Sequence, residues 1–318
     1  MWTWAEWTAD RVVRLAGLEA AQGAGAALHF FIYDLQKIVV LVAVVAFAMA
    51  LVRGALPLEK IRGWLDRPGG RVLGYPAAAA FGALTPFCSC SSVPVFLGFV
   101  QARFPIGVAF AFLITSPLVN EIAVALLGAT FGWRLALAYA GTGITLGIFG
   151  GLTLTALRAE RWLTAGAMAP VAGDEEPAPA GWRARLRDAA ETSGRILRKI
   201  APWLLVSLAL GAGMHGFVPA GFFERQFAGT GVWTVPLASL AGLPLYLSAN
   251  ATVPLLDAFV AKGVPLGTAL AFLLSAVGVS LPELVMLRSV MTVRLLVAFS
   301  FVVLVGTTLV GWLFNALQ

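Results

Sequence analysis

Residues 72–102 read VLGYPAAAAFGALTPFCSCSSVPVFLGFVQA, a run of 31 residues without a charged side chain. A transmembrane helix needs about 20 apolar residues, so this run is too long for one crossing and too short for two complete helices with a turn. The prolines between residues 85 and 94 predict a break, because proline removes a backbone donor and disrupts the preceding turn. Irregular backbone at membrane depth is stable only where protein or water satisfies it, so this segment is expected to line a cavity.

The same pattern returns 160 residues later, in the uncharged run at residues 226–256. Without any gap, residues 76–113 align with residues 236–273 and share Val-Pro, Phe-Val, Pro-x-Gly and Ala-x-Ala-Phe-Leu steps. Membrane composition alone produces matching Ala and Leu residues, but it does not account for these ordered steps. The chain is therefore predicted to contain an internal repeat, with a second break between residues 242 and 254.

The composition indicates an all-α polytopic membrane protein. Of the 318 residues, 59% are apolar and 12% are charged, and the mean hydropathy is +0.87, which excludes a water-soluble globular domain. The 22 Lys and Arg exceed the 16 Asp and Glu, and in such a chain the basic residues orient the protein in the bilayer rather than bind nucleic acid.

The basic residues also predict the topology. If the basic segments at residues 53–71 and 158–199 both face the cytoplasm, an even number of crossings lies between them. Residues 104–132 and 135–157 supply two crossings, so residues 72–102 should return to their own side as a re-entrant hairpin. Two short full spans would preserve the same parity, and the sequence does not separate these options.

This orientation places 16 basic residues in the cytoplasm and 6 outside the inner (plasma) membrane. The second hairpin then enters from the opposite side. The result is two inverted-topology repeats with about six full crossings and broken or re-entrant helices whose tips face each other, as in transporters with a site at the repeat interface.

Four parts are expected along the chain. Residues 1–26 form an N-terminal interfacial segment, because three Trp among its first seven residues suit a membrane–water interface. Residues 27–157 form the first membrane repeat, and residues 200–318 form the second. Residues 158–199 form a cytoplasmic linker, rich in Ala, Gly and Pro, followed by a basic helix.

The first break carries the motif Cys88-Ser89-Cys90-Ser91-Ser92. Thiols prefer soft ions, so Cys88 and Cys90 are candidate ligands of a soft metal or metalloid, and the serine hydroxyls could converge on the same solute. The alternative is that Cys and Ser are simply small residues that allow tight helix packing in membranes. In the second repeat, Asn250 and Thr252 occupy the positions of Cys90 and Ser92, so the polarity is kept and the thiols are lost.

Two acids, Glu121 and Glu283, lie deepest in the predicted spans. A carboxylate inside a membrane is a functional candidate by default, and it could couple transport to protons or attract a cation. Alternatively, it could cap the unwound helix or pair with Arg288. Asp257, just beyond the second break, is a weaker candidate for proton coupling.

Three motifs resemble those of the predicted-permease family that includes the organoarsenical efflux permeases. They are Thr85-Pro86-Phe87-Cys88-Ser89-Cys90-Ser91-Ser92-Val93-Pro94, Pro105-Ile106-Gly107 and Thr115-Ser116-Pro117-Leu118-Val119-Asn120-Glu121. The resemblance implies an inner-membrane permease, with members that expel trivalent organoarsenicals such as methylarsenite. It also implies that the paired cysteines of the family correspond to Cys88 and Cys90, and its polar helix motif to Asn120 and Glu121.

We therefore expect a permease, not an enzyme, that exports a trivalent organoarsenical by alternating access with proton exchange at Glu121. Other soft metals or sulfur compounds, a passive channel, and a membrane thiol oxidoreductase using Cys88 and Cys90 are the alternatives. The chain has no Gly-rich phosphate-binding motif, so direct ATP use is not expected. No cofactor and no nucleic-acid partner are expected, the partners being the solute and the lipid bilayer, and a homo-oligomer is left open.

Overall fold

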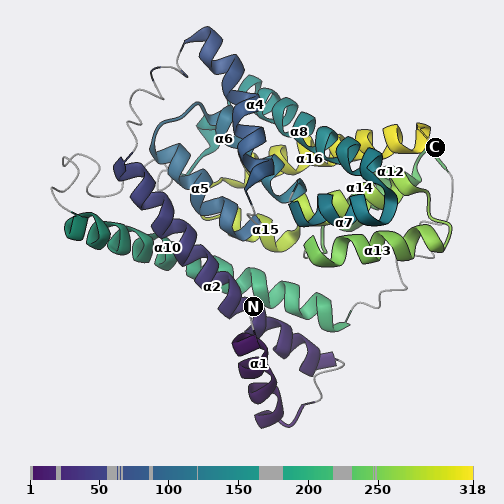
Figure 1. The fold of residues 1–318 in the computed structure, drawn as a ribbon, viewed down its shortest axis with the longest axis horizontal. Coiled ribbons are helices and arrows are strands. Elements are labelled where there is room, and N and C mark those ends of the chain that lie inside the picture. Colours follow the sequence, from purple (N-terminus) through teal and green to yellow (C-terminus); the bar gives the residue numbers. More distant parts are fainter. Residues whose placement is uncertain are drawn as a thin grey trace.

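The computed structural model describes residues 3–18, 23–55, 63, 65, 67–85, 89–119, 121–164, 182–217, 231–245, 247 and 249–317. Apart from an isolated β-bridge, the regular structure in these ranges is helical (Figure 1). The first half contains α1 (Thr3–Leu15), α2 (Gly23–Ala55), α4 (Pro68–Leu84), α5 (Ser89–Gln101), α6 (Ile106–Leu118), α7 (Glu121–Phe131), α8 (Trp133–Ala156) and the short 3₁₀ helix η1 (Ala159–Trp162). The second half contains α10 (Trp182–Phe217), α12 (Thr234–Gly242), α13 (Ala249–Ala261), α14 (Leu266–Gly278), α15 (Leu281–Leu287) and α16 (Val293–Ala316).

Four described helical segments are long and apolar enough to cross a membrane, and they are Gly23–Ala48, Trp133–Ala156, Leu266–Leu287 and Val293–Ala316. A fifth is obtained if Ile106–Leu118 and Ala123–Phe131, which are bent by 47° at a break, count as one span. The expected crossing at residues 200–223 contributes only the short apolar segment Ile200–Leu210. The expected number of about six full crossings is therefore not reached in the part of the chain that the structure describes.

Helix boundaries recur with the 160-residue offset. Three helices of the first half, α5, α6 and α8, have counterparts in α13, α14 and α16 with the same first and last positions after the offset. The long helices α2 and α10 also correspond within two residues. In the first half, α6 packs against α4 and α8. In the second half, α14 packs in the same way against α12 and α16. The two halves thus share these helix boundaries and the packing around the middle helix.

Equivalent glycines explain why the same helices pack closely in both halves. A Cβ atom on Gly82 of α4 would lie 3.0 Å from the carbonyl oxygen of Phe112, and one on Gly242 of α12 would lie 2.5 Å from that of Phe272. Helices in membranes associate through such small residues, because their backbones can then approach closely. This contact therefore helps to hold α4 on α6 and α12 on α14.

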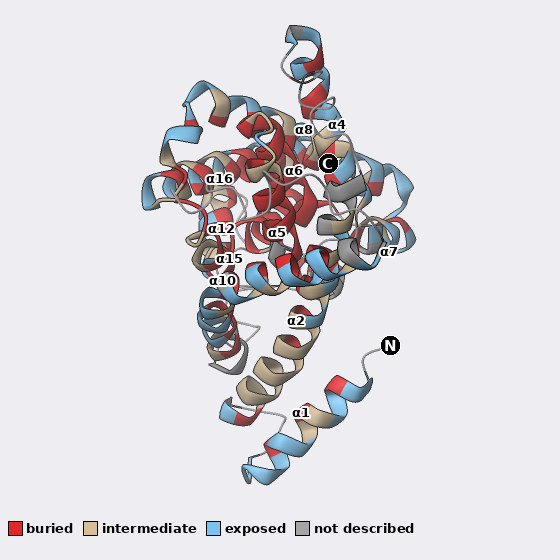
Figure 2. Ribbon diagram, turned by 90° about the vertical axis from the view of Figure 1, so that its left-hand side faces the viewer, coloured by how far each residue is buried: buried red, intermediate tan, exposed pale blue. Residues whose placement is uncertain are grey.

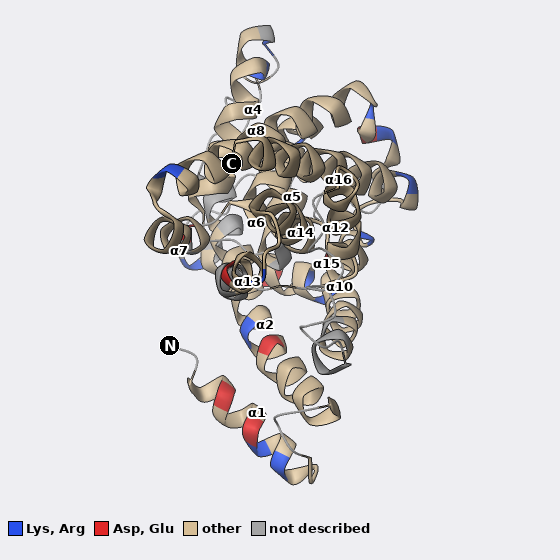
Figure 3. Ribbon diagram, turned by 90° about the vertical axis from the view of Figure 1, so that its right-hand side faces the viewer, with Lys and Arg blue, Asp and Glu red and all other residues tan. Residues whose placement is uncertain are grey.

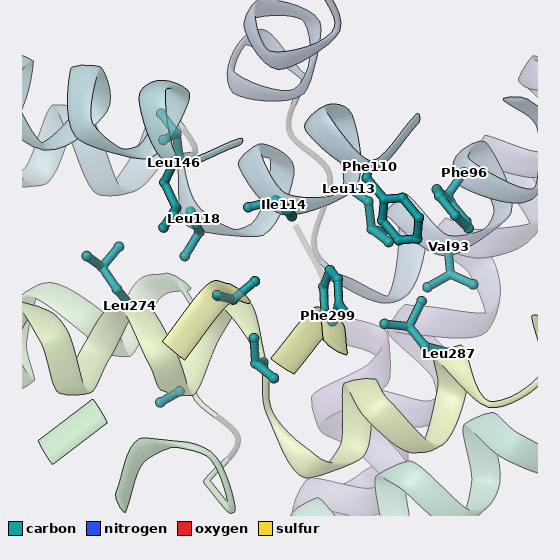
Figure 4. Packing of buried hydrophobic residues seen from close by; sticks show 14 of the residues in the cluster. Val93, Phe96, Phe110, Leu113, Ile114, Leu118, Leu146, Leu274, Leu287 and Phe299 are labelled. Atoms are coloured by element: carbon teal, nitrogen blue, oxygen red, sulfur yellow. The ribbon is translucent and has the colours of Figure 1, made fainter. Parts of the chain in front are cut away.

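The core is built around α6 and α14. Every residue of α6 is buried, and so is every residue of α14 except Val277; Figure 2 shows the central helices as the main buried region. Large side chains from both halves meet here, including Phe110 of α6 and Phe299 of α16, whose ring centroids are 6.2 Å apart (Figure 4). Charged residues lie mainly on the outer helices and at helix ends (Figure 3).

Contacts between the halves join equivalent helices or exchange them. The counterparts α6 and α14 contact each other, as do α8 and α16, and α2 and α10. The remaining contacts are exchanged, since α5 packs against α15 while its counterpart α13 packs against α7. Leu118 lies where a Cβ on Gly278 would be, and Leu146 lies where one on Gly306 would be. The interface between the halves is therefore close-packed.

The end of α8 is joined to the start of α16 by a short backbone pairing, which we call the linker clasp (residues 162–164 and 290–292). Leu163 and Met291 form an antiparallel bridge. The N–H of Thr164 donates to the carbonyl of Val290 at 3.0 Å, and the N–H of Thr292 donates to that of Trp162 at 3.0 Å. The clasp therefore links the two halves on the side where the linker leaves α8.

The outer helices differ in one respect from the expected layout. Helix α10 is continuous from Trp182 to Phe217, so the expected boundary between residues 199 and 200 falls inside a helix. Its Ser193 hydroxyl donates to the carbonyl of Ala43 at 3.0 Å, which ties it to α2. Helix α1 packs on α2, where the Nε2 atom of His29 lies 3.1 Å from a carboxylate oxygen of Asp10, and this end of the molecule projects beyond the other helices (Figure 1).

Candidate functional site

The first predicted break is present between α4 and α5. Helix α4 ends at Leu84, and the hydroxyl of Thr85 donates to the carbonyl of Phe81 at 2.7 Å, which satisfies an end group of the helix. Helix α5 begins at Ser89 and continues through Pro94, so the break is shorter than the sequence predicted. Cys88 lies outside the described residues, and Ser89 and Cys90 are described only as backbone of the first turn of α5.

The next two residues of the motif point into the protein interior. Ser91 and Ser92 are completely buried. The hydroxyl of Ser92 is 2.7 Å from that of Ser116 on α6, which is also completely buried, and either hydroxyl could donate. One turn further along, Phe96 packs against Phe110 of α6 with ring centroids 5.1 Å apart. The start of α5 is therefore fixed against α6 by a buried polar contact.

The second break of this half lies between α6 and α7, inside the run expected to form one helix at residues 104–132. Helix α6 ends at Leu118, where the hydroxyl of Tyr139 on α8 donates to the carbonyl of Leu118 at 2.6 Å. Asn120 lies outside the described residues. Glu121 is the first residue of α7, and its side chain is exposed on the protein surface.

The second half contains the corresponding breaks. Helix α12 ends at Gly242 and α13 begins at Ala249, with Pro254 inside α13. The N–H of Leu281 donates to the carbonyl of Leu243 at 2.8 Å, so the two breaks of this half lie side by side. Asn250 and Thr252 are on α13, but their side chains lie outside the described residues. Asp257, also on α13, is exposed.

Glu283 is the acid that the fold places in the interior, with 2% of its surface exposed. It lies in the first turn of α15, where its N–H donates to the hydroxyl of Ser280 at 3.4 Å. The cap is thus Ser280 rather than the carboxylate. Arg288, the partner considered from the sequence, donates to the carbonyl of Met291 at 3.1 Å.

The buried acid and the serine motif belong to two helices that touch across the halves, α15 and α5. Leu287 of α15 points toward Val93 of α5 (Figure 4). Residues four apart share a helix face, so Glu283 lies on the face of α15 that carries Leu287. The structure thus brings the first break of one half and Glu283 of the other to the same interface.

Sequence reasoning missed three residues at these breaks. Ser280 could have been found, because Ser280 with Glu283 three residues later fits a helix-start pattern. Ser116 lies in a motif already singled out, but its pairing with Ser92 depends on how α5 packs. Tyr139 has no local signal, since its role depends on α8 lying beside the end of α6.

Comparison with known proteins agrees with this architecture. The model of a family described as predicted permeases matches residues 24–316. The UPF0718 protein YraQ of Escherichia coli is 27% identical over 256 residues, covering 79% of this chain and 71% of that protein. The UPF0718 protein MJ0584 of Methanocaldococcus jannaschii is 18% identical over 299 residues, covering 76% of this chain and 82% of that protein. No solved structure matches significantly. Since the family model covers most of the chain, the protein belongs to this family of predicted permeases.

Proposed function

We propose that this permease exports a small thiophilic solute across the inner membrane, and that the solute is a trivalent organoarsenical. The observation that carries the proposal is the start of α5, where a Cys-x-Cys motif leads directly into the buried pair Ser91 and Ser92. Thiols select soft ions and metalloids, and a broken helix supplies polar groups at the same place. The resemblance of the motif to that of organoarsenical efflux permeases supports the choice of solute.

Transport by alternating access between two inverted repeats is supported by the way the halves meet. The linker clasp joins the C-terminal end of α8 to the N-terminal end of its counterpart α16. Counterparts that meet in this manner run in opposite directions, as inverted repeats require. The broken helices of both halves lie close to the interface, where such transporters bind their solutes.

Proton coupling is proposed to use Glu283, together with Glu121 and Asp257. Glu283 is buried at the interface, whereas Glu121 and Asp257 are exposed. Burying a charged carboxylate is costly, so a group that is sealed in one state and open to water in another can bind and release a proton as the protein cycles.

The test is uptake of methylarsenite by everted membrane vesicles, with and without a proton gradient. We expect wild type to accumulate methylarsenite when energised, and the Cys88→Ser, Cys90→Ser double variant to lose this uptake. Thr153→Ser, a conservative change at an exposed position of α8, is the matched control and should transport normally. Absence of uptake by correctly inserted wild type would reject the organoarsenical.

Two competing functions give different results in the same vesicles. If the solute is another soft metal or a sulfur compound, that compound inhibits methylarsenite uptake, or the vesicles accumulate that compound and no methylarsenite. If the protein is a thiol oxidoreductase, changing one cysteine to serine traps a mixed disulfide with a partner, and no flux of solute occurs.

A further inference from the structure

Two helix pairs that are equivalent under the internal repeat differ in how far they are covered. We propose that the structure is one end state of the transport cycle, closed at the α5–α15 pair and open to water at the equivalent α7–α13 pair. This inference rests on the proposed alternating access, and it adds which side is open and which surface forms the entrance.

The two pairs are equivalent by position and by contact. With the 160-residue offset, α5 corresponds to α13, and the start of α7 corresponds to that of α15. Each pair joins one helix from each half, since α5 contacts α15 and α13 contacts α7. A molecule with exact twofold symmetry would therefore bury both pairs equally.

Burial breaks this symmetry. Leu97 of α5 is 1% exposed, whereas its counterpart Asp257 on α13 is exposed. Val95 of α5 is buried, whereas its counterpart Leu255 is only half-buried. On the other helices, Ala125 of α7 is exposed and its counterpart Val285 on α15 is half-buried. At each of these matched positions the α7–α13 pair is the more open one.

The covering helices account for the difference. Helix α2 packs against α5, helix α10 packs against α15, and α2 and α10 also pack against each other. The main contacts of α7 and α13 are instead with α8, with α14 and with one another. The two long outer helices therefore close one pair and leave the other with an uncovered surface.

The uncovered surface has the composition of a water-facing wall. Its exposed described side chains are small, hydroxyl-bearing or charged, and they are Glu121, Ala125, Ala129 and Thr130 on α7, Asp257 and Ala261 on α13, and Lys262 directly after α13. Large exposed apolar side chains lie elsewhere, such as Phe149 on α8 (63% exposed) and Phe301 on α16 (66% exposed). Lipid favours the second kind of surface and disfavours carboxylates, so α7 and α13 face water.

The linker clasp identifies the side on which each pair ends. Helix α15 ends at Leu287, three residues before the clasp, so the closed pair ends on the linker side. Helix α8 has its C-terminal end at the clasp and is 24 residues long, about 36 Å at 1.5 Å per residue. Its N-terminal end, Trp133, is therefore on the opposite side, and α7 ends two residues before it. The open pair therefore ends on the side opposite to the linker, where Glu121 and Asp257 meet water while Glu283 is sealed.

Labelling with a membrane-impermeant maleimide tests this assignment. Ala125→Cys probes the open pair, its counterpart Val285→Cys probes the closed pair, and Leu97→Cys is a second probe of the closed pair. Phe301→Cys is the control that faces lipid. Wild type, which retains Cys88 and Cys90, supplies the background, and reagent is added from either side of the membrane, to spheroplasts or to inverted vesicles.

We expect Ala125→Cys to react above background from the side opposite to the linker. Its rate should be about tenfold higher than that of Val285→Cys or Leu97→Cys labelled from the linker side, because thiol reactivity requires exposure. Phe301→Cys should not react from either side. Two results would overturn the proposal: an Ala125→Cys thiol as unreactive as that of Phe301→Cys, or closed-pair variants that react as fast as Ala125→Cys. The labelling pattern does not depend on the cargo, so a failure of methylarsenite uptake remains a separate result.

Discussion

The hydroxyls of Ser92 and Ser116 lie 2.7 Å apart in the interior and join the first turns of α5 to the end of α6. The second half has Ala276 at the position of Ser116, so this bond is absent there by composition. Its buried hydroxyl, Ser275, donates instead to the carbonyl of Ser239 on α12 at 2.5 Å. The half that carries the cysteines thus has a buried hydroxyl contact between α5 and α6.

Ser116→Ala should destabilise the protein and weaken solute binding. The change removes the hydrogen bond between Ser92 and residue 116, at a cost of about 0.5–1.5 kcal/mol, and it loosens the helix that begins beside Cys90. We expect a lower unfolding temperature in detergent and a several-fold higher KM for uptake in vesicles. Ser116→Thr, which retains a hydroxyl, should recover most of the KM, and Thr145→Ala, at an exposed position of α8, should behave as wild type. An unchanged KM in Ser116→Ala would show that the contact is only structural.

Tyr139→Phe should weaken the break between α6 and α7. Its hydroxyl donates to the carbonyl of Leu118 at 2.6 Å, and a buried carbonyl that loses its donor costs about 1–3 kcal/mol. Tyr75→Phe is the matched control, because its partner Thr155 also donates to the carbonyl of Gly151 at 2.9 Å and stays satisfied. Thermal unfolding should therefore show a larger loss for Tyr139→Phe. Equal decreases in unfolding temperature would mean that the hydrogen bond of Tyr139 contributes no more to stability than that of Tyr75.

Gly242→Ala should be more harmful than Gly82→Ala. A Cβ at residue 242 meets the backbone oxygen of Phe272 at 2.5 Å, which cannot move aside, whereas at residue 82 the closest atom is 3.0 Å away. Gly141→Ala, where nothing lies within 4 Å, should instead stabilise α8 by up to about 1 kcal/mol, because Ala favours helix over Gly. Expression level and unfolding temperature in detergent measure all three variants. Stabilisation by Gly242→Ala would contradict the close packing of α12 on α14.

Glu283→Gln should abolish the effect of a proton gradient on uptake while the protein remains folded, because Gln keeps the shape of the side chain and cannot carry the proton. Glu121→Gln and Asp257→Asn, at exposed positions, should reduce the gradient effect less. The measurement is uptake in vesicles with an imposed pH difference, compared with counterflow, which needs no gradient. A Glu283→Gln variant that still responds fully to the gradient would remove this residue from the coupling mechanism.

Much of this fold was predictable because its signals are local. The uncharged runs, the helix ends near Thr85 and Gly242, and the 160-residue offset all follow from residue type and order, and the helix boundaries agree with them. The start of α5 was placed too late, because Pro94 is accommodated inside the helix. Proline in a membrane helix is tolerated where neighbouring helices satisfy the freed backbone groups.

Long-range geometry was not predictable in the same way. Pro117, four residues before Glu121, is a local sign of a break, but the size of the bend, 47°, and the exposure of Glu121 depend on how α6 and α7 pack. The bond from Tyr139 and the linker clasp join residues far apart in the chain, so they depend on packing. The different covering of the two helix pairs also has no sequence signal, because α2 and α10 could cover either pair.

Cross-linking the linker clasp should stop transport in a reversible manner. Leu163 and Met291 form a bridge whose flanking residues make the hydrogen bonds, and such antiparallel pairs have Cα atoms about 4.5 Å apart, within the range for a disulfide. In the double variant Leu163→Cys, Met291→Cys, oxidation should lock the linker side closed and abolish vesicle uptake, and a reductant should restore it. The oxidised single variants and wild type control for effects on Cys88 and Cys90. If the cross-linked protein transports as fast as the same protein after reduction, the clasp stays closed throughout the cycle, and the linker side opens elsewhere along the interface.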